Sequence, residues 1–401
     1  MKITVYRPNQ IGGCITEIES RNGTRIIVDV GANLPGVEGE PIDIKALTKD
    51  CAGVFITHYH GDHVGEYRSV HKSTDIHIGA LAKEIYYTLQ TRLSHNKKKG
   101  VMEEDLARIK NFKPFCHGIP IKINDLTVTP IRTDHSAFDS YMLLIEDGVK
   151  KVLHTGDFRD HGKVGENSLK YLKENVSEVD GLIIEGTMLS RISEGVKAEE
   201  QLSAEACEMI KNNKYVFIMC SSTHIDRIAA FYRANKAAGD KLFITDNFQK
   251  SVLDIVTANS AEYGDYYDFS ESASFNGDLH HKEMVSKGFC MLVRSNKFSR
   301  KFVNSRSFKK GQLFIYSMWK GYLDGENYND KIADIVPDDY KYLHTSGHAT
   351  EEAICKVCGI VGAPLIMPIH SERTDRFEEL KKQGSIAGEV RRLGSGKSVK
   401  V

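Results

Sequence analysis

The chain has 401 residues, with 54 lysines and arginines against 54 aspartates and glutamates, so its formal net charge is zero. This balance excludes the strong overall field of a protein that holds nucleic acid or a membrane surface by net charge alone, although it permits a local basic patch. No stretch reaches the roughly 18 consecutive apolar residues of a membrane span, and the first residues show no apolar leader. We expect a soluble, cytoplasmic protein whose eight cysteines are free thiols.

Strand signals dominate the first part of the chain. Residues 1–7 and 14–30 are rich in β-branched side chains, and Asn22-Gly23 predicts a hairpin turn. Because strands that carry ligand-type residues at their carboxyl ends can collect them at one rim of a sheet, we expect a site there. Five apolar runs have a His, Asp or Glu at or near their end; these runs are 52–58, 126–135, 150–157, 181–187 and 364–370.

A different pattern begins near residue 193. Buried-strand signals at 215–223, 241–246, 288–294 and 312–318 alternate with helical stretches at 224–239 and 247–263, which predicts a doubly wound α/β unit. Strand-plus-ligand segments lie on both sides of this unit, so we expect one domain inserted into another. The expected boundaries are 1–192 for the first part of the host domain, 193–341 for the insertion and 342–401 for the closing part.

The segment THYHGDH, residues 57–63, concentrates histidines and an aspartate directly after an apolar run. Neutral imidazole and carboxylate are preferred ligands of zinc and similar divalent ions. His58 and His60, two apart on an extended segment, project the same way and can hold one ion. Asp62 and His63, after the turn at Gly61, can reach a second. A lone histidine here would be read as structural, but this cluster predicts a two-metal site.

This segment resembles the HxHxDH signature of the metallo-β-lactamase fold, and further motifs follow in that superfamily's order. Asp29 in VDVGAN matches the first motif, an aspartate that steadies histidine ligands. His135 in TDHSAFDS and Asp157 in HTGDFRD match the third and fourth. The resemblance implies an α/β fold, the αββα sandwich of that superfamily.

Downstream, the resemblance narrows to the β-CASP nucleases. Glu185 in IIEGTML resembles their motif A, His348 in HTSGHAT their motif B, and His370 in PIHSE their motif C. The group includes the bacterial ribonuclease J enzymes and the subunit that cleaves messenger RNA at its 3′ end. Its hallmark is a doubly wound α/β (β-CASP) domain inserted into the host fold, as the strand pattern also predicts.

The resemblance assigns a role to each matching residue. His58, His60 and His135 would hold one zinc, Asp62, His63 and His370 a second, and Asp157 would bridge both; manganese is an alternative metal. Two cations about 3.5–4 Å apart can activate water and neutralise charge on a reacting phosphodiester. His348 would be the general acid, held in its protonated form by Glu185 because a nearby opposite charge favours the charged ring. Asp62 also counts among the catalytic residues.

Signals for substrate binding are weaker. Ser221, Ser222 and His224 lie where a strand gives way to a helix, a position that favours phosphate, although a plain helix N-cap would explain the hydroxyls equally well. Gly347 and Ala349 are small enough to let the backbone approach a phosphate. The basic segment 294–310 contains three phenylalanines, which predicts either contact with a single strand or an ordinary amphipathic element.

Some features depart from the ribonuclease J pattern. Motif A has Glu185 instead of the usual Asp, the insertion has no counterpart of the GSQGEP-like segment, and the sequence after His370 leaves no room for a separate C-terminal domain. His154, beside the fourth motif, is expected to be structural. We predict a two-zinc hydrolase of single-stranded RNA. The alternatives are a hydrolase of the same fold acting on DNA or a small ester or phosphodiester, and a non-catalytic nucleic-acid-binding descendant.

Overall fold

The computed structural model describes residues 1–94, 99–176, 178–191, 195–275, 277–324 and 327–401. The chain forms two compact units, one from residues Met1–Gly195 with Gly347–Val401 and the other from Val196–Ser346. We propose that the second unit is the inserted domain expected at 193–341. Within the described ranges, no helix has the length and apolar character needed to cross a membrane.

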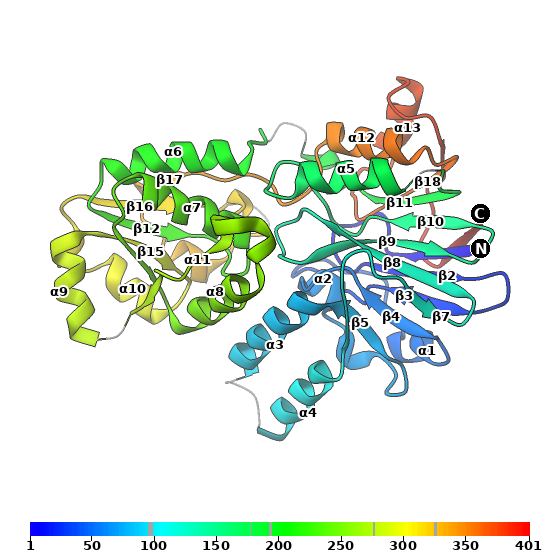
Figure 1. The fold of residues 1–401 in the computed structure, drawn as a ribbon, viewed down its shortest axis with the longest axis horizontal. Helices are drawn as coiled ribbons and strands as arrows, with labels where there is room; N and C mark the ends of the chain where they lie inside the picture. The colour runs from blue at the N-terminus through cyan, green and yellow to red at the C-terminus, as the bar shows by residue number, and fades with distance from the viewer. Residues whose placement is uncertain (95–98, 177, 192–194, 276, 325–326) are drawn as a thin grey trace. The chain divides into compact units, whose positions relative to one another are not determined.

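The first sheet of the first unit has seven strands in the order β20-β1-β2-β3-β4-β5-β6. The hairpin expected at Asn22-Gly23 joins β2 and β3, where Gly23 has a φ of +86° that glycine adopts without strain. The last strand pairs with the first, so both chain ends lie in this sheet (Figure 1). Its strands are β1 (Lys2–Tyr6), β2 (Ile15–Glu19), β3 (Arg25–Val28), β4 (Gly53–Ile56), β5 (Ile76–Gly79), β6 (Lys113–Phe115) and β20 (Lys397–Lys400).

The second sheet also has seven strands, in the order β19-β18-β11-β10-β9-β8-β7. Its central strands β10, β11 and β18 run parallel, although β18 follows the second unit in the sequence. Parallel strands bring their carboxyl ends to the same edge. The strands are β7 (Ile121–Ile123), β8 (Leu126–Thr133), β9 (Ser140–Glu146), β10 (Lys151–His154), β11 (Gly181–Glu185), β18 (Leu365–Ile369) and β19 (Glu389–Val390).

The two sheets bury a core between them, and β9 shows how the layers are built. Leu143 and Ile145 point into the inter-sheet core, whereas Met142 and Leu144 belong to a second core on the opposite face. Helices α5, α12 and α13 cover that opposite face (Figure 1), and α3 packs on β5 and β6 of the first sheet. The unit is therefore an αββα sandwich. Its helices are α1 (Ile44–Thr48), α2 (Gly61–Val64), α3 (Ala80–Ser94), α4 (Lys99–Lys110), α5 (Gly165–Asn175), α12 (Glu351–Val361) and α13 (Arg376–Lys382).

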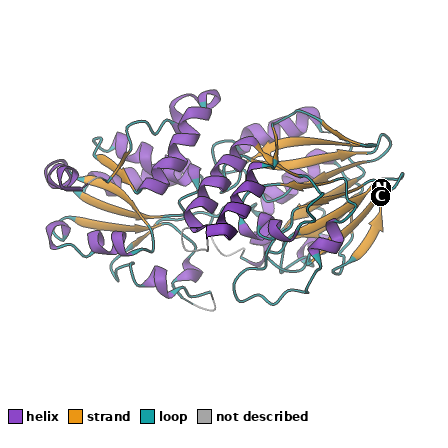
Figure 2. Cartoon of the chain, turned by 90° about the horizontal axis from the view of Figure 1, so that it is seen from below, coloured by secondary structure: helices purple, strands orange, loops and turns teal. Residues whose placement is uncertain are grey.

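The second unit is built on a parallel sheet of six strands in the order β14-β13-β15-β12-β16-β17, flanked by helices (Figure 2). This is the doubly wound α/β arrangement. The strands are β12 (Tyr215–Met219), β13 (Leu242–Thr245), β14 (Ala273–Ser274), β15 (Phe289–Val293), β16 (Gln312–Tyr316) and β17 (Lys341–Tyr342). The helices are α6 (Glu199–Lys211), α7 (Ile225–Ala237), α8 (Asn247–Asn259), α9 (Gly277–Lys287), α10 (Lys297–Val303) and α11 (Asp330–Ala333).

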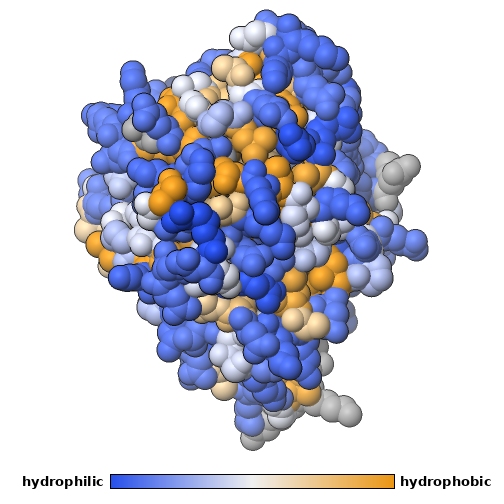
Figure 3. Space-filling view, turned by 90° about the vertical axis from the view of Figure 1, so that its right-hand side faces the viewer, coloured by the Kyte–Doolittle hydropathy of each residue, from blue (hydrophilic) through white to orange (hydrophobic). Residues whose placement is uncertain are grey.

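The face of the first unit that carries the chain ends is mostly hydrophilic, with small apolar patches between the polar side chains (Figure 3). Scattered apolar side chains of this kind are normal on a protein surface. The polar residues of interest gather instead inside the unit, at the carboxyl ends of its strands.

Candidate metal centre

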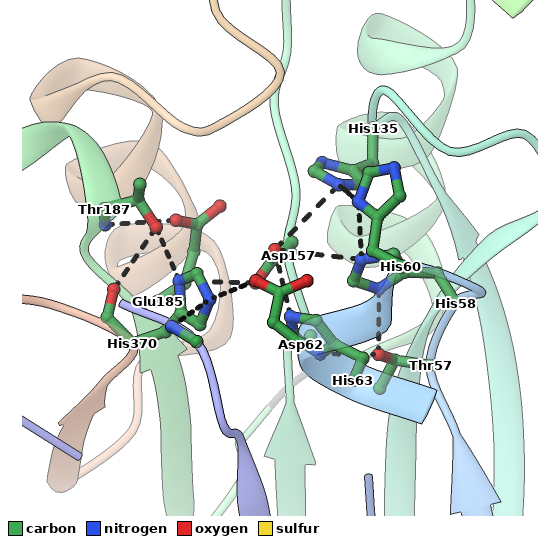
Figure 4. Close-up of polar contacts among 12 residues, drawn as sticks. Thr57, His58, His60, Asp62, His63, His135, Asp157, Glu185, Thr187 and His370 are labelled. Atoms are coloured by element: carbon green, nitrogen blue, oxygen red, sulfur yellow. Dashed lines mark hydrogen bonds and ion pairs between the residues drawn. The ribbon is translucent and has the colours of Figure 1, made fainter. Parts of the chain in front are cut away.

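Strands from both sheets of the first unit end at one cluster of polar side chains (Figure 4). In the first sheet, Asp29 follows β3 and His58 follows β4, with His60 beginning the short helix α2. In the second sheet, His135 follows β8, Asp157 follows β10, Glu185 ends β11 and His370 follows β18. The fold therefore brings together residues that are far apart in the sequence.

Three histidines converge at one side of the cluster. The Nδ1 atom of His60 lies 3.1 Å from His58 Nε2 and 3.1 Å from His135 Nε2. Burial lowers the pKa of His58 and His135 well below the usual value and lowers that of His60 to about 4, so all three rings are neutral near pH 7. Neutral imidazoles that share one small volume suit a divalent cation.

Asp157 lies at the centre of the cluster. It is 2% exposed, and neither of its carboxylate oxygens has a hydrogen-bond partner. A buried carboxylate is costly unless positive charge compensates it, so this position fits a metal between the two sets of ligands. Imidazole nitrogens at 3.1–3.9 Å from the Asp157 oxygens belong to His58, His63, His135, His348 and His370.

A second group of donors lies on the other side of Asp157. His370 Nε2 is 3.3 Å from Asp62 Oδ2, and the buried His63 Nε2 has no hydrogen-bond partner. Cys14 lies beside them: its sulfur and one ring nitrogen each of His63 and His370 are within 4.8 Å of one another. Sequence reasoning missed Cys14, because nothing in its local sequence marks it as a ligand.

Charge sets the protonation of this second group in the metal-free chain. Burial opposes protonation of His63 and His370, but the Asp157 carboxylate and Cys14, with Asp29 beside His63 and Asp62 beside His370, together outweigh it and raise the pKa of both rings well above the usual value. Burial would raise the pKa of Asp62, but its hydrogen bond with His370 and the charge of His63 lower it. The Asp157 pKa is likewise held well below its usual range, despite burial, by His370 and His63.

Asp29 orients His63 from behind. Its Oδ2 atom lies 2.8 Å from His63 Nδ1, and its Oδ1 accepts a hydrogen bond from the Thr57 backbone N–H at 2.8 Å. This contact makes Nδ1 the donor and leaves Nε2 for a metal. Asp29 has a φ of +61°. This backbone conformation is strained for a residue other than glycine, so the surrounding packing must hold it in place.

His370 is held in a similar way. Its φ is +51°, and its Nδ1 lies 2.7 Å from the Thr187 hydroxyl, in the segment that follows β11. The Gly12 backbone N–H lies 3.2 Å from the opposite nitrogen, Nε2. The ring position is therefore fixed by residues from two separate segments.

A buried ion pair joins the loops that carry His135 and Asp157. Arg159 Nε donates to Asp134 Oδ1 at 2.9 Å, and the Arg159 backbone N–H donates to the Asp134 carbonyl at 2.8 Å. Both side chains are almost completely buried. This pair fixes the spacing of two expected ligands from adjacent loops.

Glu185 and His348 are in direct contact. His348 Nδ1 lies 3.2 Å from Glu185 Oε1, and the fully buried glutamate also accepts hydrogen bonds from the backbone N–H groups of Phe158 and Thr187. His348 is more accessible, with 23% of its side chain exposed. The pair thus places a half-buried imidazole, backed by a buried carboxylate, beside the metal ligands.

Gly347 and Ala349 make contacts within the protein. The His135 Nδ1–H donates to the Gly347 carbonyl at 2.5 Å, and a side chain on Gly347 would clash with Ser136. Ala349 is fully buried and its N–H donates to Glu185 at 3.4 Å. The expected phosphate contact at these two residues stays a prediction.

His154 is not part of the ligand cluster. Its Nδ1 accepts a hydrogen bond from the Gly156 N–H at 3.0 Å, and its Nε2 lies 3.2 Å from the Thr16 hydroxyl. Burial lowers its pKa to about 4, so the ring is neutral. Both nitrogens have partners, as a structural histidine requires.

Ser221, Ser222 and His224 belong to the second unit. Ser221 is exposed, the Ser222 hydroxyl accepts a hydrogen bond from Gln249, and His224 Nε2 lies 3.4 Å from Glu199. The N-cap residue of α7 is His224, whose side chain makes no capping hydrogen bond. The two serines therefore precede the N-cap instead of occupying it.

The basic segment 294–310 differs from one sequence expectation. Phe302 and Phe308 are buried in the core of the second unit, and Phe298 packs against the same core, so these rings are not available to stack on bases. Arg294 pairs with Asp246, and Arg300 with Asp334. The phenylalanine spacing reflects one buried face of an amphipathic element.

Comparisons with known proteins place this geometry in a family. Residues 24–219 match the family model described as "Beta-lactamase superfamily domain". The chain is 22% identical to the ribonuclease J of Sinorhizobium meliloti, over 94% of this chain and 69% of that protein. It is 24% identical to ribonuclease J of Helicobacter pylori strain B128, over 90% of this chain but only 54% of that protein, so it spans about half of that relative's length.

The fold has a solved counterpart. A crystal structure of a protein of unknown function from Enterococcus faecalis V583 is similar over 99% of both chains, with a TM-score of 0.73 and 17% sequence identity. At this identity the likeness concerns the fold. With the family match and the ligand cluster, it leads to one assignment: the chain contains a β-lactamase superfamily domain and is a metal-dependent hydrolase that is similar to the ribonucleases J over most of its length.

Proposed function

We propose that the chain is a two-zinc phosphodiesterase that hydrolyses single-stranded RNA. The observation that carries the proposal is the buried Asp157 carboxylate, which has no hydrogen-bond partner and is surrounded by imidazole nitrogens. Asp157 would bridge two cations. His58, His60 and His135 would hold the first, and Asp62, His63 and His370 the second.

The protein residues around the centre would hold and orient the metal ligands. Two zinc ions at such a centre activate a water molecule and neutralise charge on the phosphodiester. Asp29 keeps His63 Nε2 directed at its metal position, because Nδ1 is engaged at 2.8 Å. The neutral rings of His58, His60 and His135 act as ligands without first losing a proton.

His348 would protonate the leaving 3′ oxygen. Its Nδ1 donates to Glu185 Oε1, so the proton for the leaving group would come from the opposite nitrogen, Nε2. Glu185 is fully buried and held by backbone N–H groups, so it can fix the ring without moving. His348 would therefore act on the substrate, and Glu185 would act through His348.

RNA is the substrate proposed because the relatives over nearly the whole chain are ribonucleases by name. In the second unit, the exposed Ser221, with Ser222 and His224, precedes the N-terminus of α7, where backbone N–H groups and the helix dipole favour phosphate. We propose these three residues as phosphate contacts, together with basic side chains of 294–310 that are not paired with Asp246 or Asp334.

The proposal can be tested by digestion of labelled single strands. RNA and DNA oligonucleotides of the same sequence, carrying 5′-monophosphate, 5′-triphosphate or 5′-hydroxyl ends and a 3′ label, are incubated with the zinc-loaded chain, with and without a chelator. We expect cleavage of RNA that the chelator abolishes and that added zinc restores. The size of the labelled products separates internal cleavage from stepwise removal from the 5′ end.

Other outcomes would overturn the proposal. Cleavage of DNA but not RNA, or of a small phosphodiester alone, would be consistent with the proposed metal centre but would show that RNA is not the substrate. Salt-dependent RNA binding without turnover by the metal-loaded chain would indicate a non-catalytic binding protein. Alanine at Ser222 should weaken RNA binding, and unchanged binding would remove the α7 N-terminus from the proposed path.

A further inference from the structure

We propose that the thiolate of Cys14 is a ligand of the second metal position, beside His63 and His370. The inference deepens the proposed two-metal function and rests on it. The ligand sets assigned above contain only imidazole and carboxylate donors. A thiolate would change the chemical character of one of the two positions.

The first support is proximity. The sulfur of Cys14 and one ring nitrogen each of His63 and His370 lie within 4.8 Å of one another, which places all three donors around a single ion-sized volume. Cys14 is 6% exposed and both histidines are 1% exposed, so water cannot replace the thiol easily. The three residues come from the start of β2, from α2 and from the end of β18.

The second support is the way in which the backbone of Cys14 is held. Its N–H donates to the Asp62 carbonyl at 3.0 Å, and its carbonyl accepts from the Gly31 N–H at 2.9 Å. A Cβ on Gly31 would come within 1.7 Å of the Asp62 carbonyl oxygen, so this close packing requires glycine. Cys14 is therefore locked against the loop that carries Asp62 and His63.

The neighbouring Gly12 connects the same segment to the last ligand. Its N–H lies 3.2 Å from His370 Nε2, and its own φ of +89° is favourable only for glycine. The segment 12–14 thus contacts Asp62 on one side and His370 on the other. This arrangement gives the thiol a fixed place among the donors.

An independent observation points to a ligand at this place. His63 Nε2 and both oxygens of Asp157 are buried and make no well-formed hydrogen bond, although Nε2 lies 3.1 Å from Asp157 Oδ2. Native proteins rarely leave several buried polar atoms unpaired in one spot unless an ion satisfies them. All eight cysteines lie in the described residues, and Cys14 alone among them joins the ligand clusters found there.

The consequence is that the two metal positions differ. The first has three neutral imidazoles, whereas the second has imidazoles, the Asp62 carboxylate and the Cys14 thiolate. Thiolate is a soft ligand that favours zinc over manganese, which prefers oxygen donors. We infer that the second position is selective for zinc over manganese. On metal binding the thiol proton passes to the buffer, and no redox step is involved.

Cobalt(II) is a suitable probe because a thiolate ligand gives it a charge-transfer band in the near ultraviolet that imidazole and carboxylate do not. The metal-free chain is titrated with cobalt(II) chloride. We expect the band in the wild-type chain, its loss in Cys14→Ser, and its retention in Cys51→Ser. Cys51 is a matched control because it is a buried free cysteine of the same unit that belongs to none of the ligand clusters.

Two metal-binding readouts accompany the spectrum. X-ray absorption of the zinc-loaded wild-type chain should show a sulfur neighbour at about 2.3 Å. The preference of the second position for zinc over manganese should fall by roughly tenfold or more in Cys14→Ser, since even residues that only orient metal ligands have effects of this size. Cys51→Ser should leave the preference unchanged.

The outcomes separate this inference from the proposed function. If the wild-type chain binds two equivalents of cobalt without the band, or if Cys14→Ser keeps the band, Cys14 is not a ligand and the two-metal centre stands. If the wild-type chain binds no divalent metal, the proposed function fails as well. Should Cys14→Ser not fold, the absorption spectrum of the wild-type chain decides, because absence of sulfur overturns the inference.

Discussion

The Nδ1 atom of His348 lies 3.2 Å from Oε1 of Glu185, beside the cluster of expected metal ligands. This contact gives the first prediction. His348→Ala should keep both metals and lose turnover by roughly 10²–10⁴-fold, the usual contribution of a general acid. The measurement is kcat on an RNA oligonucleotide together with metal content.

His71→Ala is the matched control for this change, because His71 is a histidine of the same unit whose side chain contacts Ser73. It should behave as wild type. Glu185→Gln should reduce kcat while KM changes little, since the glutamate acts through the His348 ring. Unchanged turnover in His348→Ala would mean that another group protonates the leaving oxygen.

A second prediction concerns Asp157. Asp157→Asn keeps the shape of the side chain but removes the charge that both metal positions share, so occupancy of the two positions should fall together. Elemental analysis after dialysis measures it. Asp147→Asn is a suitable control, because Asp147 is also buried but bonds Arg21 and turn amides. A variant with one position still full would contradict the bridging role.

Asp29 supports a third prediction. Asp29→Asn would place an amide N–H group opposite His63 Nδ1 and favour the wrong ring tautomer. Metal affinity should fall by about 10–100-fold, the usual effect of losing a carboxylate behind a histidine ligand. Competition with a chromophoric chelator measures this affinity. Thr57→Val is not a matched control, because the Thr57 hydroxyl lies 2.9 Å from Asp29 and also 3.1 Å from His58 Nδ1; unchanged metal affinity in Asp29→Asn would argue against the tautomer explanation.

A fourth prediction concerns protons. Asp157, Cys14 and the neighbouring carboxylates together raise the pKa of His63 and His370 above the usual value of roughly 6.5, so metal binding near neutral pH must expel protons from these rings. Calorimetric titration of the metal-free chain in buffers of different ionisation enthalpy should therefore show proton release. Metal affinity should rise with pH until the raised pKa values are passed.

The same shifts set the stability of the metal-free chain. A histidine whose pKa is raised on folding contributes stability that is fully present below its unfolded pKa of roughly 6.5 and is lost as pH rises through the folded value. The melting temperature of the metal-free chain should therefore fall on the alkaline side of neutrality. Asp157→Asn should reduce both the proton release and this part of the pH dependence, and an unchanged result would show that Cys14, Asp29 and Asp62 raise the two pKa values without Asp157.

Much of the fold could be read from local sequence. Runs such as 181–187 and 364–370 combine a short apolar stretch with an acidic or histidine residue at its end, and both strands lie where that pattern puts them. The strand β9 (Ser140–Glu146) was not predicted, although it is a buried apolar run like β11, which was recognised from its sequence.

The candidate site was predictable only where several ligand-type residues are adjacent or match a known motif. The histidines of 57–63 stand out by themselves, whereas Glu185 and His348 were identified from the resemblance. Cys14 carries no local signal, since its contacts to His63 and His370 exist only after distant segments pack together. The phenylalanines of 294–310 show that a sequence signal can also mislead. Their spacing is the same for a face buried in the core, which the structure shows, and for a surface that stacks on bases.

The position of β18 has a consequence for the newly made chain. This strand completes the second sheet beside β11, yet it emerges from the ribosome after the whole second unit. A growing polypeptide that ends at residue 346 holds every proposed metal donor except His370, and it also lacks His348. The proposed metal centre can therefore be completed only after the second unit has been synthesised and β18 has joined the second sheet.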